Sequence, residues 1–332
     1  MKKTKVDMRG MSLLRLEDLT HDQMMYLIDL ADTLKKQRRF DGNLLKGRHI
    51  ALVFEKMSTR TRCAAAVAMA DEGGRSEYLS ATEIHLGKKE STSDTARVLG
   101  RMFDGIFFRG YEQKTVELLA EYSKVPVWNG LTDECHPTQA LADLMTIREN
   151  FPRLQKVKVV YMGDGRNNVA TSLMTACAMA GMEFVNCTPK ALAPSLEMMK
   201  AKEKMARLNG GVVSMDHNPS TAVKNANVIY TDVWVSMGEE SQHDRRMKLL
   251  KPYQVNMGLM KRTGNLESGK VIFLHCLPAF HDSNTELTAK TGALEVTDEV
   301  FEAPFSKVFD LAENRLHTIK ALFVATLSRK VV

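Results

Sequence analysis

Cysteine is scarce in this chain, and its arrangement excludes two classes of site. The 332 residues include only five cysteines, an odd number, and no two of them form a Cys-x-x-Cys pair. They are Cys63, Cys135, Cys177, Cys187 and Cys276. A disulfide framework or a zinc cluster needs paired or regularly spaced cysteines. We therefore expect neither a disulfide framework nor a zinc cluster, and most of the thiols should be small buried hydrophobic groups. We also expect no other metal and no cofactor.

Long apolar runs and aromatic-rich basic segments are also missing. No stretch approaches the roughly 20 apolar residues that span a bilayer, and the basic N-terminal segment lacks the apolar core of a secretory signal. The net charge of +6 comes from dispersed lysines and arginines, accompanied by only seven tyrosines. These patterns predict a cytoplasmic protein that binds neither membrane nor nucleic acid. They favour positive clefts that attract a small anionic substrate.

Alternating helical and strand patterns predict an α/β fold. Short apolar runs recur between segments of helical periodicity in both halves of the chain, which indicates mostly parallel sheets with helices on both faces. The length suits two domains of ordinary size. Asn150, Phe151 and Pro152 interrupt a helical segment, so we place the boundary there and predict domains at 1–150 and 151–332.

Residues 49–74 predict an anion site. An apolar strand at 49–55 is followed by a polar turn at 57–62 and an alanine-rich helix at 63–70, with Ser58 as the N-cap. A helix start directly after a strand leaves backbone N–H groups unpaired at the positive end of the helix dipole. The hydroxyls and guanidinium groups of 58–62 add donors that suit a phosphate. The alternative is an ordinary capped helix with two solvated arginines.

Further polar groups fall at the same predicted sheet edge. Arg109 ends the strand at 103–108, and His136 and Gln139 flank Pro137 at a helix start after a loop at 129–135. Ligands of parallel sheets bind beyond the C-terminal ends of the strands. A structural role for His136 is the alternative, but the shared edge favours a binding site.

The strands of the second half also end in polar groups. Gly-Asp-Gly-Arg-Asn-Asn at 163–168 follows a strand, but the third glycine and the acidic residue of a dinucleotide fingerprint are missing, which disfavours NAD. Asp232 lies in the strand segment 228–233, and Cys276 follows the strand at 271–274. The charged run at 236–253 has the composition of a mobile lid or of a plain surface loop. Arg315 lies near the predicted start of the last helix, where a cation opposes the helix dipole, and this hints at another use.

Together these motifs resemble the aspartate/ornithine carbamoyltransferase family. They are Ser-Thr-Arg-Thr-Arg at 58–62, Phe-Arg-Gly at 108–110, His-Pro-Thr-Gln at 136–139, Asp-x-x-x-Ser-Met-Gly at 232–238, His-Cys-Leu-Pro at 275–278, and Arg315. The first three resemble the carbamoyl-phosphate set, and the next two resemble the pair specific for ornithine. The match covers essentially the whole chain.

The resemblance implies transfer of the carbamoyl group from carbamoyl phosphate to the side-chain amine of L-ornithine, giving L-citrulline and phosphate. Arginine biosynthesis and the arginine deiminase pathway both use this reaction. It also implies two doubly wound parallel-sheet domains joined by helices, with the C-terminal helix packing back on the first domain. The assembly it implies is a homo-oligomer, a trimer or a multiple of trimers, with active sites at subunit interfaces.

The resemblance further implies roles for individual residues. Those expected to bind carbamoyl phosphate are Ser58, Thr59, Arg60, Thr61, His85, Arg109, His136, Pro137, Thr138, Gln139, Cys276, Leu277 and Arg315. Those expected to bind ornithine are Asn168, Asp232, Ser236 and Met237. Those expected to take part in catalysis are Arg60, Arg109, His136, Asp232, Cys276 and Arg315. The chemistry agrees, because attack of an amine on a mixed anhydride needs positive donors and no covalent nucleophile.

One position departs from the family pattern. Where such enzymes usually offer a glutamine from a neighbouring subunit to the phosphate, this chain has His85. A protonated imidazole could donate to the phosphate, and that contact would weaken as pH rises through neutrality. A putrescine carbamoyltransferase, which shares the phosphate half, is the alternative within the same chemistry. A regulatory or scaffold protein with a decayed site is the alternative outside it.

Overall fold

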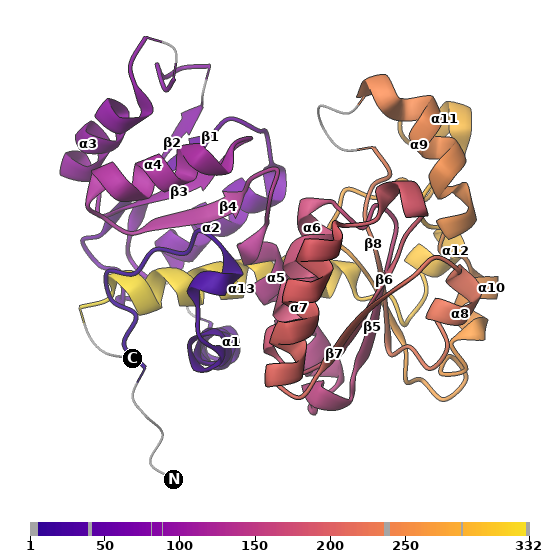
Figure 1. Ribbon diagram of the computed structural model, residues 1–332. Helices are drawn as coiled ribbons and strands as arrows, with labels where there is room; N and C mark the ends of the chain where they lie inside the picture. Colours follow the sequence, from indigo (N-terminus) through magenta and orange to yellow (C-terminus); the bar gives the residue numbers. More distant parts are fainter. Residues whose placement is uncertain are drawn as a thin grey trace. The chain divides into compact units, whose positions relative to one another are not determined.

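The computed structural model describes residues 6–38, 42–80, 82–87, 89–235, 240–286 and 288–329. The chain forms two compact units, the first built from the residues up to Met145 and from Glu313 onward, the second from Thr146–Ala312. It passes between them within α5 (Pro137–Asn150) and α13 (Val308–Leu327) (Figure 1). The C-terminal segment from Glu313 therefore belongs to the first unit.

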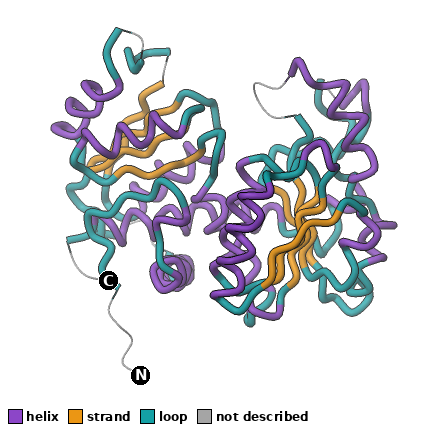
Figure 2. The backbone as a smooth tube through the Cα atoms, viewed as in Figure 1, coloured by secondary structure: helices purple, strands orange, loops and turns teal. Residues whose placement is uncertain are grey.

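A parallel sheet of four strands organises the first unit. The strands are β1 (His49–Phe54), β2 (Arg75–Ser80), β3 (Gly105–Arg109) and β4 (Val127–Leu131), in the order β2-β1-β3-β4. Figure 2 shows the strands in orange and the helices around them in purple. The helices are α1 (His21–Lys36), α2 (Thr59–Asp71), α3 (Thr92–Met102) and α4 (Gln113–Ser123), besides parts of α5 and α13. Phe323 of α13 contacts Phe107 and Trp128 of the sheet, with ring centroids 5.7 and 4.7 Å away. The last helix thus contributes to the core of the first unit, as predicted.

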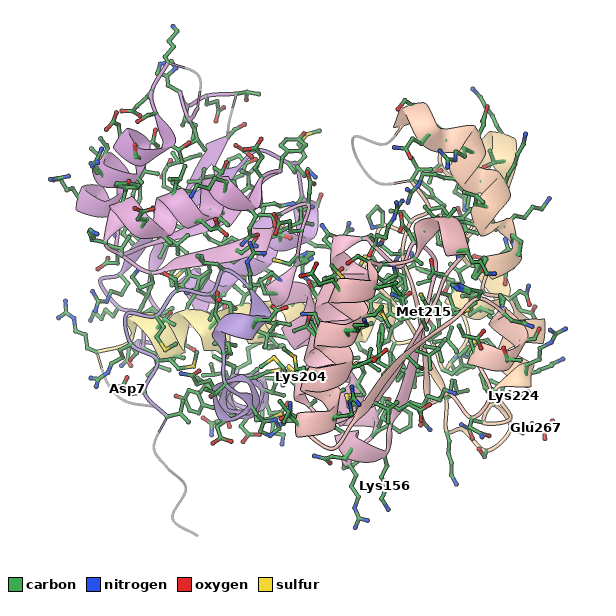
Figure 3. The ribbon with its side chains drawn as sticks, viewed as in Figure 1. Asp7, Lys156, Lys204, Met215, Lys224 and Glu267 are labelled. Atoms are coloured by element: carbon green, nitrogen blue, oxygen red, sulfur yellow. The ribbon has the colours of Figure 1, made fainter. Side chains whose placement is uncertain are left out.

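A parallel sheet of five strands organises the second unit. The strands are β5 (Lys158–Met162), β6 (Glu183–Cys187), β7 (Val212–Asp216), β8 (Val228–Thr231) and β9 (Ile272–His275), in the order β7-β6-β5-β8-β9. The helices are α6 (Asn168–Met179), α7 (Leu196–Leu208), α8 (Pro219–Ala222), α9 (His243–Leu250), α10 (Met257–Arg262), α11 (Thr288–Thr291) and α12 (Asp298–Phe301). Lys156, Lys224 and Glu267 precede β5, β8 and β9 and mark the edge at which these parallel strands begin (Figure 3).

The predicted α/β class is confirmed, and two local predictions were wrong. Residues 59–62 are not a turn before a helix but the first turn of α2, because the Ser58 hydroxyl accepts a hydrogen bond from the Thr61 N–H at 3.2 Å and caps the helix there. Asn129 lies in β4 rather than in a loop, since its strand continues to Leu131. In the described part of the chain, no helix has both the length and the apolar character needed to cross a bilayer.

Candidate functional site

The N-terminus of α2 presents donors at the carboxyl end of β1. Ser58 has an extended backbone, with φ of −162° and ψ of 116°, and starts the helix. Ser58 and Arg60 are half-buried and Thr59 is exposed, whereas Thr61 is fully buried. The free N–H groups of a helix start and its dipole favour a bound anion.

Two buried guanidinium groups meet at the Thr61 hydroxyl. Arg315 donates from Nη2 to Thr61 Oγ1 at 2.6 Å, and Arg109 donates from Nη1 to the same oxygen at 3.4 Å. Arg109 ends β3, whereas Arg315 comes from α13, 254 residues further along the chain than Thr61. These contacts hold both guanidinium groups at one point, at the start of α2. The arrangement suits a ligand with several charged oxygens.

His136 lies next to this pair and is held neutral. Its ring is buried, and burial together with the charges of Arg315 and Arg109 lowers the pKa of His136 well below its usual value. Thr138 Oγ1 is 3.4 Å from His136 Nδ1, at the start of α5, where Pro137 is the first residue. A neutral imidazole can still donate one hydrogen bond to a carbonyl oxygen.

Gln139 offers an acceptor beside His136. Its Nε2 donates to Asp143 Oδ1 at 2.9 Å, which assigns the orientation of the amide. Within the described residues, the buried Gln139 Oε1 has no hydrogen-bond donor. A buried acceptor without a partner costs on the order of 1–3 kcal/mol unless a ligand supplies the donor. An amide N–H₂ group of a ligand could do so.

We expect His136 to make the folded protein less stable in mild acid. Because its pKa is lowered in the fold, the unfolded chain takes up a proton near pH 6.5 that the folded chain does not. This stabilising contribution is therefore complete above about pH 6.5 and is lost as pH falls towards the folded-state pKa. Urea unfolding between about pH 5 and 8 should show a steeper acid loss for wild type than for His136→Asn. His85→Asn is the control, and parallel curves for wild type and His136→Asn would contradict the assignment.

His85 stands apart from this group. It is exposed on the segment between β2 and α3, and its side chain has no hydrogen bond or ion pair to another described residue. Its predicted contact with a phosphate on another subunit stays a prediction.

In the second unit, Asp232 and Cys276 meet at the ends of neighbouring strands. Asp232 directly follows β8 and Cys276 directly follows β9. Asp232 Oδ1 accepts from Cys276 Sγ at 2.9 Å and from the Val233 N–H at 2.8 Å. Burial raises the pKa of Asp232, while His275 and the Cys276 thiol oppose that rise. A buried carboxylate of this kind is suited to pairing with an ammonium group of a ligand.

The structure adds partners that sequence reasoning missed. Asn167 donates from Nδ2 to Asp232 Oδ2 at 3.1 Å and to the Tyr161 hydroxyl at 2.7 Å, while its Oδ1 caps α6. Fully buried Glu295 places Oε1 3.3 Å from His275 Nε2. The only sequence signal for Asn167 was its place in the Gly-Asp-Gly-Arg-Asn-Asn turn, and Glu295 gave none.

The remaining predicted residues differ in their surroundings. Asn168 is half-buried as the first residue of α6, beside Asn167. Leu277 has a left-handed backbone, with φ of 59°, and its N–H donates to His275 Nδ1 at 2.9 Å. Ser236 and Met237 lie outside the described residues. Arg315 is seven residues past the start of α13 at Val308, so the argument from an unfavourable position near the helix N-terminus was wrong.

One cluster near Asp232 contains atoms that a metal could use. Ligand atoms of Asp232, His275 and Cys276 lie within 4.8 Å of one another. However, Nδ1 of His275 accepts from Leu277, and Nε2 faces Glu295. A metal would have to displace one of these contacts, so the cluster fits a hydrogen-bonded network better than a zinc site.

Known proteins match both halves of the chain. The family model described as the carbamoyl-P binding domain of aspartate/ornithine carbamoyltransferase matches residues 11–149, and the model of the Asp/Orn binding domain matches residues 155–326. The catabolic ornithine carbamoyltransferase of Bacillus cereus is 54% identical over 332 residues, which is 98% of each chain. The ornithine carbamoyltransferase of Streptococcus equi subsp. equi is 54% identical over 327 residues, 96% of each chain.

Solved structures with a similar fold carry the same enzyme name as these relatives. The ornithine carbamoyltransferase of Pyrococcus furiosus has a TM-score of 0.89 at 43% identity, covering 97% of this chain and 98% of its own. That of Gloeobacter violaceus has a TM-score of 0.83 at 39% identity, covering 97% and 100%. The sequence motifs, the two parallel sheets and both family models agree. The chain belongs to the aspartate/ornithine carbamoyltransferase family.

Proposed function

We propose that this chain transfers the carbamoyl group of carbamoyl phosphate to the side-chain amine of L-ornithine, forming L-citrulline and phosphate. The observation that carries the proposal is the meeting of Arg109 and Arg315 at Thr61, beside a neutral His136. Two buried positive groups next to a helix N-terminus suit the phosphate of an acyl phosphate, and a neutral imidazole suits its carbonyl group. Relatives named ornithine carbamoyltransferase support the same reaction.

In this proposal the first unit binds carbamoyl phosphate. Ser58, Thr59, Arg60 and Thr61 hold the phosphate at the start of α2, together with Arg109. His136 donates to the carbonyl oxygen, and Gln139 Oε1 accepts from the carbamoyl nitrogen. Arg60 and Arg315 stabilise the negative charge that develops on the carbonyl oxygen.

The second unit binds ornithine in this proposal. Asp232 is the anionic partner of an ornithine ammonium group, and Asn168 is a neutral partner for the α-carboxylate. Cys276 holds Asp232 in place through its thiol. The predicted contacts of Ser236 and Met237 with ornithine, and of Cys276 and Leu277 with carbamoyl phosphate, stay predictions.

The reaction needs no covalent enzyme intermediate. The side-chain ammonium of ornithine first loses one proton to bulk water, and the free amine attacks the carbonyl carbon. A C–N bond forms while the carbonyl π electrons move onto oxygen. The tetrahedral intermediate then expels phosphate by breaking the C–O bond. The departing phosphate accepts the second proton from nitrogen, which leaves a neutral urea group on the product.

The assembly and the pathway rest on the resemblance. We propose a cytoplasmic homotrimer, or a multiple of trimers, because the family pattern places ligands from a neighbouring subunit at the phosphate. Native mass spectrometry measures the assembly directly. The word catabolic in the names of relatives such as the Bacillus cereus protein favours the arginine deiminase pathway over biosynthesis.

Substrate competition tests the proposed function. We expect the specificity constant kcat/KM for L-ornithine to exceed that for putrescine by several-fold to about a hundredfold, because putrescine has no α-carboxylate to pair with the polar groups near Asp232. L-Lysine and L-aspartate should be poorer still. The measurement is citrulline or carbamoyl-product formation at fixed carbamoyl phosphate. If putrescine equals or exceeds ornithine, the ornithine assignment is wrong, although carbamoyl transfer survives.

A further inference from the structure

Arg246 is buried although it lies on a short, charged surface helix. The residue is 1% exposed, whereas its neighbour Arg245 on α9 is exposed. Burying a guanidinium group costs several kcal/mol unless it is paired and hydrogen-bonded. The partners of Arg246 should therefore explain why the chain keeps an arginine there.

Two short hydrogen bonds connect the guanidinium group to two different loops. Nη2 donates to Asp164 Oδ2 at 2.6 Å, and Nε donates to the Trp234 carbonyl at 2.6 Å. Asp164 is itself buried, and its Oδ1 accepts from the Arg166 N–H at 2.9 Å. Arg246 therefore ties the loop that follows β5 to the segment that follows β8.

Both tied segments carry residues of the proposed ornithine site. The loop after β5 leads to Asn167, whose amide donates to Asp232, and to Asn168. Trp234 lies two residues after Asp232. Packing reinforces the connection, since Trp234 is buried in an apolar cluster that includes Leu250 of α9 and Leu192. A shift of either segment would alter the contact between Asn167 and Asp232.

We propose that Arg246 is a positioning residue for the ornithine site: it fixes the loop after β5 against the segment after β8, so that Asn167, Asn168 and Asp232 are aligned before ornithine binds. The inference rests on the proposed function. Arg246 acts through Asp164 and Trp234 and does not contact the substrate. A ligand site that is pre-aligned in this way avoids the ordering cost on binding.

Steady-state kinetics of Arg246→Met and Arg246→Lys test the proposal. We expect Arg246→Met to raise KM for L-ornithine about ten- to a hundredfold, the scale for a site misplaced by about 1 Å. KM for carbamoyl phosphate should stay within about twofold of wild type, because none of the affected contacts belongs to the first unit. Arg246→Lys keeps the charge but loses the planar fork of the guanidinium group. Its KM for L-ornithine should therefore lie between the values of wild type and Arg246→Met.

A substrate analogue and matched variants separate positioning from general stability. Binding of L-norvaline, which has the amino-acid end of ornithine without its side-chain amine, is measured by calorimetry in the presence of carbamoyl phosphate and should weaken in parallel with the ornithine KM. Arg245→Met is the control for loss of a charge on α9 and should match wild type. Asp164→Asn keeps the shape and should reproduce the Arg246 effect in part, even if Arg246→Met folds poorly.

The outcomes distinguish failure of the proposed function from failure of the positioning role alone. Wild-type protein that does not carbamoylate ornithine overturns the proposed function, and the positioning role with it. Normal wild-type turnover, combined with an unchanged ornithine KM in folded Arg246→Lys and Asp164→Asn, overturns only the positioning role. A lower melting temperature and a smaller active fraction, with unchanged KM values, would also overturn it, because that is the result of a purely structural arginine.

Discussion

Replacing Arg315 by lysine should lower kcat/KM for carbamoyl phosphate on the order of a hundred- to a thousandfold, the cost of losing one preorganised donor in a buried site. Arg315 is buried and reaches Thr61 at 2.6 Å, beside Arg109 and His136. Lysine keeps the positive charge but cannot bond the hydroxyl and a substrate oxygen with one planar fork. Inhibition by inorganic phosphate should weaken as well, because the product carries the same oxygens.

The control for this variant is Arg101→Lys. Arg101 lies on the surface of α3 and donates to the Arg97 carbonyl, so its replacement should leave activity unchanged. Circular dichroism and the unfolding midpoint show whether Arg315→Lys is folded. An Arg315→Lys enzyme within a few-fold of wild type would remove Arg315 from the proposed chemistry.

Replacing Asp232 by asparagine should lower kcat/KM for ornithine on the order of a thousandfold, because removing one partner of a buried charge pair costs about 3–5 kcal/mol. The amide keeps the size of the side chain, but it leaves the ornithine ammonium group without an anion. Affinity for carbamoyl phosphate should be nearly unchanged, since Asp232 and its contacts belong to the second unit. Calorimetry with carbamoyl phosphate alone measures this directly.

The pH profile provides a second check on Asp232. Burial raises its pKa above the usual value of about 3.9. Ornithine binding by wild type should weaken as pH falls through that raised range, because the carboxylate takes up a proton. This weakening of ornithine binding at low pH should be missing in Asp232→Asn. Asp216→Asn, at the end of β7 in the same sheet, is the control, and its ornithine binding should weaken at low pH as in wild type. An Asp232→Asn variant with a normal ornithine KM would contradict the assignment.

Local signals in the sequence were sufficient for most of the fold. Apolar runs and helix caps act over a few residues, so the alternation of helix and strand could be predicted from the sequence. Ser58, which the sequence predicted as an N-cap, accepts a hydrogen bond from the Thr61 N–H and caps α2. Errors occurred at element ends, as at the start of α2 and the end of β4, where tertiary hydrogen bonds and strand pairing decide the boundary.

The sequence by itself also determined which residue types gather at the site, because polar groups after parallel strands share one edge of a sheet. From this rule we predicted that Arg109 and His136 lie at the same edge. It could not show that Arg315 and Arg109 share the Thr61 hydroxyl, that burial lowers the pKa of His136, or that Arg246 ties two loops together. Those facts depend on side chains up to 254 residues apart and on how deeply each is buried. Burial sets the pKa values and the strength of each charge contact, and only the tertiary structure decides it.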